Sequence, residues 1–100
     1  MEDELKETED KISSVLRGIE SLLHYKNEKY GNSILKPKKI FSNVDAGNRI
    51  LIRLEEKISR IESSIRNECE PNKNDISDII GYLTLYCVHK EWLDFNEFKD

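Results

Sequence analysis

Two aspartates, Asp75 and Asp78, are spaced for joint chemistry within an expected helix. Residues three apart lie on the same face of a helix, so both carboxylates can face one ligand. The stripe that holds Asp78 continues with Tyr82 and Leu85, and an ionised acid among apolar side chains is costly unless it is paired or bound to a cation. The alternative is that both acids lie in the first helical turn, where carboxylates meet the positive end of the helix dipole.

The preceding helix carries a charged stripe formed by Arg53, Glu56 and Arg60, with Lys57 on its flank. Because these residues are three or four apart, they can form ion pairs with one another on a solvated face, each worth about 0.2–0.5 kcal/mol. The functional alternative requires the stripe to line a groove, closed by another subunit, where the basic side chains could bind an anion.

The charge is unevenly distributed along the chain. Residues 1–10 hold six acids and one base, a net charge of -5, so the other ninety residues sum to about +1 of the total of -4. Residues 21–40 hold five lysines against Glu28 alone, and this local charge of +4 suits an anionic ligand. A solvated lysine face is the alternative.

Other catalytic and binding templates do not occur. The four glycines are scattered rather than gathered in a phosphate loop, and His24 and His89 have no evident Cys or Ser partner. Cys69 and Cys87 are too few for a disulfide scaffold or a zinc site and indicate two reduced thiols. Net acidity and the lack of a helix-turn-helix or finger pattern argue against nucleic-acid binding.

Three amphipathic helices must position these residues. Apolar side chains at three-four spacing predict helices over about residues 4–29 and 48–67, and a third that starts after Pro71, capped by Asn72 or Asn74, and runs to about residue 91. The sequence therefore predicts an all-α fold, a small bundle of three main helices completed by oligomerisation. The expected organisation is a single α-helical domain over residues 1–100, with an acidic helix start at 1–10, a connector at 31–47 and an aromatic tail at 92–100.

The apolar residues also predict which surfaces are buried. In the second helix the expected buried face is Leu51, Leu54, Ile58, Ile61 and Ile65. The third helix is apolar nearly all round, which predicts a buried central helix, and the aromatic tail is expected to pack back on the bundle or on a second subunit. No apolar run reaches the roughly 20 residues that span a bilayer, and the acidic start is unlike a secretory signal, so we expect no membrane contact and a cytoplasmic location.

Three segments, in order, resemble the nucleotide modification associated domain 1 family. Residues 26–33 are similar to its K-N-x-D-Y-G-x-S segment, residues 53–61 to its R-x-x-D-K-x-x-R-L helix and residues 74–82 to its D-x-x-x-D-L-x-N-Y helix. That family, found in phages and bacteria, itself resembles the all-α nucleoside triphosphate pyrophosphohydrolases of MazG type. The resemblance implies that Glu56, Asp75 and Asp78 hold Mg²⁺, with Glu56 and Asp78 in catalytic roles.

The resemblance also implies how a nucleotide would be bound. Tyr30 or Tyr82 could stack on a base, and Asn32 could read its edge; core packing for Tyr82 and a turn for Asn32 are the alternatives. Phosphate oxygens would be held by basic side chains. These are Lys26, Lys29, Arg53, Lys57 and Arg60.

Three functions follow as hypotheses. The first is a Mg²⁺-dependent nucleoside triphosphate pyrophosphohydrolase. The second is a non-catalytic nucleotide-binding protein, for instance a phage protein that sequesters a nucleotide signal. Two residues support it: Ser59 stands where the pyrophosphohydrolases have a carboxylate, and Lys29 replaces the family's acid. The family resemblance itself supports the first hypothesis. The third is a helical interaction module that builds a homo-oligomer without a small ligand.

Overall fold

The computed structural model describes residues 1–36 and 44–99, and in these ranges the chain is helical with no strand. This confirms the all-α prediction. The connector predicted over 31–47 falls partly outside the described residues, and its last two positions belong to the second helix. The elements are α1 (Glu2–Tyr30), α2 (Ala46–Arg66), α3 (Lys73–Lys90) and the short 3-10 helix η1 (Asn96–Phe98).

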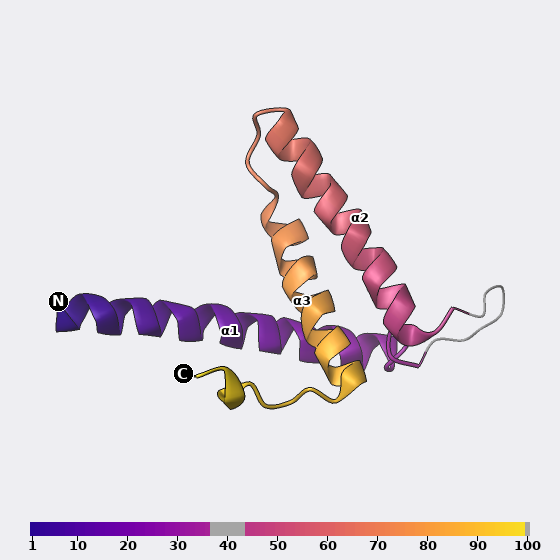
Figure 1. The fold of residues 1–100 in the computed structure, drawn as a ribbon, viewed down its shortest axis with the longest axis horizontal. Coiled ribbons are helices and arrows are strands. Elements are labelled where there is room, and N and C mark those ends of the chain that lie inside the picture. Colours follow the sequence, from indigo (N-terminus) through magenta and orange to yellow (C-terminus); the bar gives the residue numbers. More distant parts are fainter. Residues whose placement is uncertain (37–43, 100) are drawn as a thin grey trace. The chain divides into compact units, whose positions relative to one another are not determined.

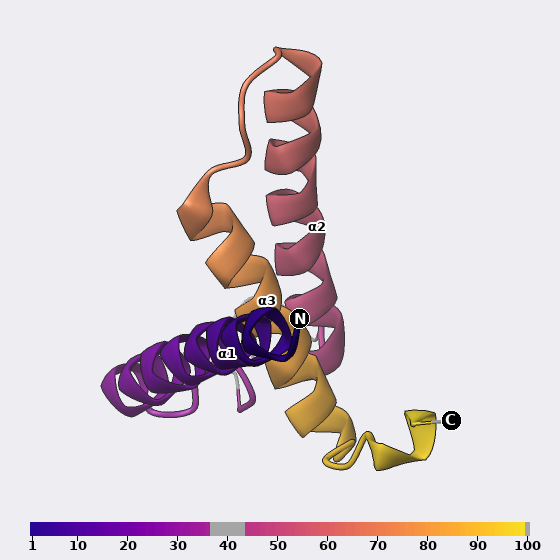
Figure 2. The ribbon, with the colours of Figure 1, turned by 90° about the vertical axis from the view of Figure 1, so that its left-hand side faces the viewer.

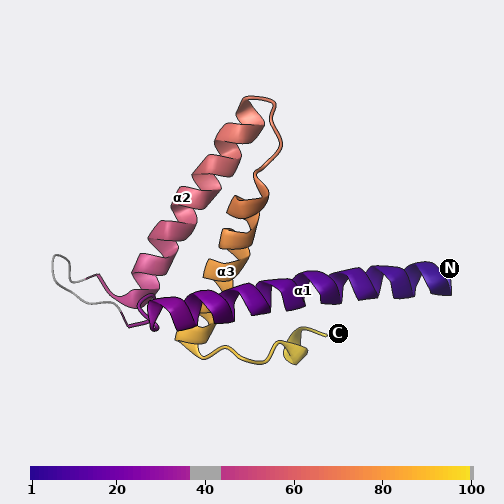
Figure 3. The same ribbon diagram turned by 180° about the vertical axis from the view of Figure 1, so that it is seen from behind.

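The chain divides into two compact units, Met1–Gly31 and Asn32–Asp100, and each is described by itself. The first unit is α1, one continuous helix of 29 residues (Figure 3). It ends as the sequence predicts, because Gly31 takes the left-handed conformation at φ 58° and its N–H donates to the Asn27 carbonyl. None of the helices in the described part of the chain is both long and apolar enough to cross a membrane.

The second unit is built on α2 and α3, which lie side by side and run in opposite directions (Figures 1 and 2). Capping fixes where each helix begins. The Asp45 side chain accepts a hydrogen bond from the Asn48 N–H at 2.8 Å, and the Asn72 side chain accepts one from the Asn74 N–H at 2.7 Å. The cap at Asn72 confirms one of the two predicted start points of α3.

Replacing Asp45 by alanine should lower the free energy of unfolding by about 1 kcal/mol, because the first turn of α2 loses its side-chain acceptor. Asp45→Asn is the matched control, since its amide oxygen can still accept the bond from the Asn48 N–H. Urea unfolding followed by circular dichroism measures both variants. Equal losses for the two would mean that the charge of Asp45, rather than the cap, stabilises the helix.

The face of α2 that meets α3 differs from the predicted face. Leu54 and Ile61 lie in the contact as expected, but Leu51, Ile58 and Ile65 are exposed. The α2 residues that meet α3 recur every three or four positions. Compared with the predicted apolar face, this row is rotated toward the polar side of α2, and it includes one lysine. That row is Ala46, Ile50, Leu54, Lys57, Ile61 and Ser64.

The prediction of α3 as a buried central helix is wrong. Within the second unit only Asp75 and Gly81 of α3 are buried, whereas Ile76, Leu83 and Val88 are exposed, because the contact with α2 covers one stripe of the helix.

The aromatic tail is exposed along its described length, residues 92–99. Its first ring nevertheless packs back on α3: the Trp92 and Tyr86 ring centroids are 6.0 Å apart in an edge-to-face arrangement, and Phe95 lies beside Phe98.

Candidate functional site

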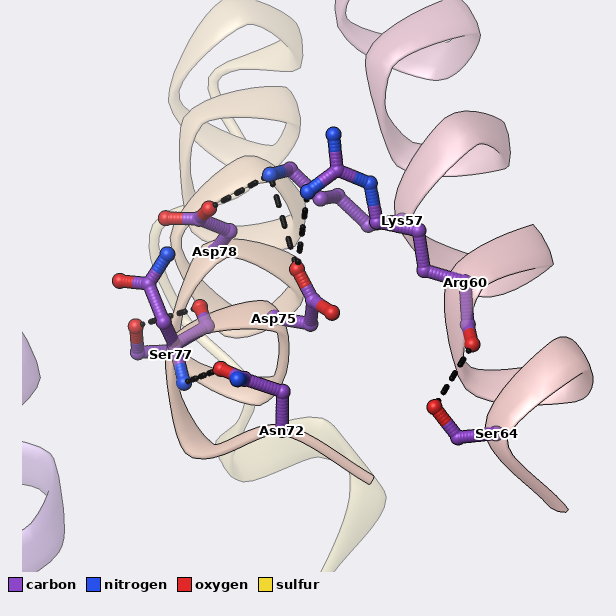
Figure 4. Close-up of polar contacts among 8 residues, drawn as sticks. Lys57, Arg60, Ser64, Asn72, Asp75, Ser77 and Asp78 are labelled. Atoms are coloured by element: carbon purple, nitrogen blue, oxygen red, sulfur yellow. Dashed lines mark hydrogen bonds and ion pairs between the residues drawn. The ribbon is translucent and has the colours of Figure 1, made fainter. Parts of the chain in front are cut away.

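Four charged side chains meet across the α2–α3 contact and form what we call the inter-helix charge cluster: Lys57, Arg60, Asp75 and Asp78 (Figure 4). The Lys57 Nζ atom lies 3.0 Å from the Asp78 Oδ2 atom and 3.7 Å from the Asp75 Oδ1 atom. The Arg60 Nη1 atom lies 3.6 Å from the same Asp75 oxygen. Two cations from α2 therefore face two carboxylates from α3.

The cluster is balanced in charge and largely removed from water. The side chains of Lys57, Asp75 and Asp78 are only 16%, 11% and 14% exposed, whereas that of Arg60 is 64% exposed. Two positive and two negative charges cancel, which offsets much of the cost of desolvating them. This arrangement meets the requirement that Asp78 be paired, and the pairing partner is a lysine of the chain itself.

Local hydrogen bonds engage the backbone of both helices near the cluster. On α3, the Asn72 cap sets the first turn in which Asp75 lies, and the Ser77 hydroxyl donates to the Asn74 carbonyl at 2.9 Å (Figure 4). On α2, the Ser64 hydroxyl donates to the Arg60 carbonyl at 3.1 Å. Asp75 also gains from the positive dipole end of α3, so the dipole interaction and the ion pairs act together.

The residues expected to hold Mg²⁺ do not fit it as a set. Glu56 is exposed and directly precedes Lys57, so it points about 100° away from the side of α2 that meets α3. The Lys57 ammonium is within 4 Å of both aspartates, where a cation bound by Asp75 and Asp78 would lie. Among the described residues no group of three His, Cys, Asp or Glu side chains is placed to hold a metal ion.

Two further predicted binding residues lie beside the cluster. Arg53 is exposed and precedes Arg60 by seven residues, which places both on one stripe of α2. Tyr82 is half-buried on the stripe of α3 that contains Asp78, which agrees with its alternative role in packing. Arg53, Lys57 and Arg60 thus lie together on α2, and Glu56 is exposed beside Arg53 and Arg60 on the same helix, turned about 100° from Lys57.

The remaining predicted residues lie at the end of α1 and just after it. Lys29 places its ammonium 6.0 Å and 5.8 Å from the ring centroids of Tyr25 and Tyr30, distances that allow cation–π attraction. Lys26 is half-buried on the same helix. Asn32 has a φ of 62°, and its carbonyl accepts bonds from the N–H groups of Leu35 and Lys36, so it serves as a turn residue.

Sequence reasoning missed two features of these sites. Tyr25 was not singled out, although its spacing of four from Lys29 places the two side chains on the same face of a helix. Lys57 was placed on the flank of an outward stripe, whereas it lies in the α2–α3 contact. The sequence does indicate this position, because Lys57 follows Leu54 by three residues and precedes Ile61 by four, which places all three on one side of a helix.

Residues of two of the three motif segments meet in the cluster, since Lys57 and Arg60 belong to residues 53–61 and Asp75 and Asp78 to residues 74–82. The segment at 26–33 lies mostly in the other unit. Comparison of the chain with protein families, with curated proteins and with solved structures finds no match. Family membership therefore stays a prediction from the three motifs.

Proposed function

We propose that this protein binds a nucleotide or another phosphate-bearing small molecule without hydrolysing it, and that the phosphate meets the exposed edge of the inter-helix charge cluster. The observation that carries the proposal is the contrast within the cluster. Its carboxylates are already neutralised by Lys57 and Arg60, while Arg60 keeps 64% of its side chain in solvent.

The chemistry of Arg60 suits this role. A guanidinium has five N–H donors, and the contact with Asp75 engages a single nitrogen, Nη1. Donors therefore remain for phosphate oxygens, which arginine can hold with two parallel hydrogen bonds. Arg53 adds a second exposed guanidinium on the same stripe. The ammonium of Lys57 is less exposed and forms ion pairs with both aspartates.

Hydrolysis is less well supported than binding. A Mg²⁺ ion between Asp75 and Asp78 would have to displace the Lys57 ammonium, and the third expected ligand, Glu56, points elsewhere. The aspartates instead hold Lys57 and Arg60, and through them they fix the position of the basic edge.

Calorimetric titration of the full chain with nucleoside mono-, di- and triphosphates and cyclic dinucleotides tests the proposal. We expect binding of at least one of these, with Arg53→Ala and Arg60→Ala each weakening it by about tenfold or more through loss of a charge-assisted hydrogen bond. Arg66→Ala is the matched control, because Arg66 is an exposed arginine of the same helix that pairs with Glu62 one turn away rather than with the cluster.

The same samples, incubated with Mg²⁺ and analysed by chromatography, should return the ligand intact. Release of pyrophosphate would contradict the non-catalytic part of the proposal. Affinities unchanged in both the Arg53 and Arg60 variants would show that any bound ligand lies elsewhere, and no binding across the panel would refute the function itself.

A further inference from the structure

Helix α1 presents an apolar stripe with the spacing of a coiled-coil seam. Positions alternating by three and four residues run along the helix, and none of its residues is buried. Leu5, Ile12 and Val15 are each more than half exposed. The seam consists of Leu5, Thr8, Ile12, Val15, Ile19 and Leu22.

A helix of this kind needs a neighbour. Most helical stability in proteins comes from packing an apolar face against a neighbour rather than from the intrinsic propensity of the residues. Gly18 in the middle of α1 lowers its intrinsic stability further. We therefore expect the seam of α1 to be buried against a neighbouring helix.

The charge of α1 selects the orientation of a self-pairing. Residues 1–15 hold six acids and two bases, a net of -4, and residues 16–30 hold three bases and two acids, a net of +1. Two parallel copies would place the two strongly acidic halves side by side. Two antiparallel copies would instead place each acidic half beside the weakly basic half of the other, which is the electrostatically favoured arrangement.

The seam is also symmetric under that reversal. A two-fold axis between Ser13 and Ser14 pairs Leu5 with Leu22, Thr8 with Ile19, and Ile12 with Val15. Each pair then joins one seam position to another, so no charged residue occupies a seam position between residues 5 and 22. We infer that α1 pairs in antiparallel orientation with α1 of a second copy of the chain, a surface separate from the proposed phosphate site.

Sedimentation equilibrium of the full chain tests the pairing. We expect a mass of twice the 11.8 kDa of one chain. Ile12→Asp should weaken association by at least about 100-fold, because two charges enter the seam of each dimer. Ser14→Asp is the matched control, since it adds the same charge to the same helix outside the seam, and it should leave the dimer intact.

Orientation is tested by disulfide trapping in a Cys69→Ser, Cys87→Ser background. A mixture of the Leu5→Cys and Leu22→Cys variants should form the mixed disulfide, while either variant alone should cross-link little. Ready cross-linking of Leu5→Cys to itself would show a parallel pair and overturn the inference. A wild-type mass of one chain would also overturn the inference, because the seam would then not be covered by a second copy. A trimer or larger assembly would exclude the two-helix pairing.

Discussion

Replacing Lys57 by alanine is expected to lower the free energy of unfolding by about 2–4 kcal/mol. The substitution leaves Asp75 and Asp78, both less than 15% exposed, without the ammonium that contacts each of them. Removing one partner of a buried ion pair typically costs about 3–5 kcal/mol, and the lower figure reflects partial access of water to the cluster.

Two controls make the result for Lys57 specific. Lys11→Ala removes a lysine from a solvent-exposed pair with Glu7, where the Nζ–Oε1 distance is also 3.0 Å, and it should change stability by less than about 0.5 kcal/mol. Lys57→Met combined with Asp75→Asn and Asp78→Asn removes all three charges and should recover most of the loss. Urea midpoints of these variants decide the matter. Wild-type stability for Lys57→Ala would mean that the aspartates do not depend on the lysine.

The second large effect is expected at Ile50, whose side chain is the most deeply buried described in this chain, at 1% exposure. Ile50→Ala should lower the free energy of unfolding by about 2–4 kcal/mol, because it removes buried methyl groups and leaves a cavity between α2 and α3. Thermal or urea unfolding measures the loss. A change under about 1 kcal/mol would show that this end of the helix pair is not packed in solution.

Ile52 provides the matched control for Ile50. It lies two residues along the same helix and is 50% exposed, so Ile52→Ala makes the same chemical change at a solvent-facing position. Its expected effect is within about 0.5 kcal/mol, since surface substitutions away from special features rarely exceed this. The difference between the two variants isolates the contribution of burial from that of helix propensity.

The sequence by itself determined the helices and their ends. Apolar spacing predicted three helices, and short-range signals placed their boundaries: Gly31 ends α1 and Asn72 caps α3. These features depend on hydrogen bonds and backbone conformations within a few residues of each other, so local sequence is sufficient to specify them. The sequence also predicted that Asp78 needs a cationic partner. This follows from its neighbours along one helix, because an unpaired charge among apolar side chains costs free energy.

Only the tertiary structure decided which stripe of each helix is used. The hydrophobic pattern of α2 favoured Leu51, Ile58 and Ile65, yet the contact with α3 is rotated so that Lys57 enters it. Judged by hydrophobicity alone, a lysine is expected at the surface. Here the ion pairs of Lys57 with two aspartates on α3 compensate for the cost of removing its ammonium from water. That compensation exists only once α2 and α3 are side by side. The partner of Asp78 was therefore decided by packing between residues more than a dozen positions apart, which periodicity within one helix does not encode.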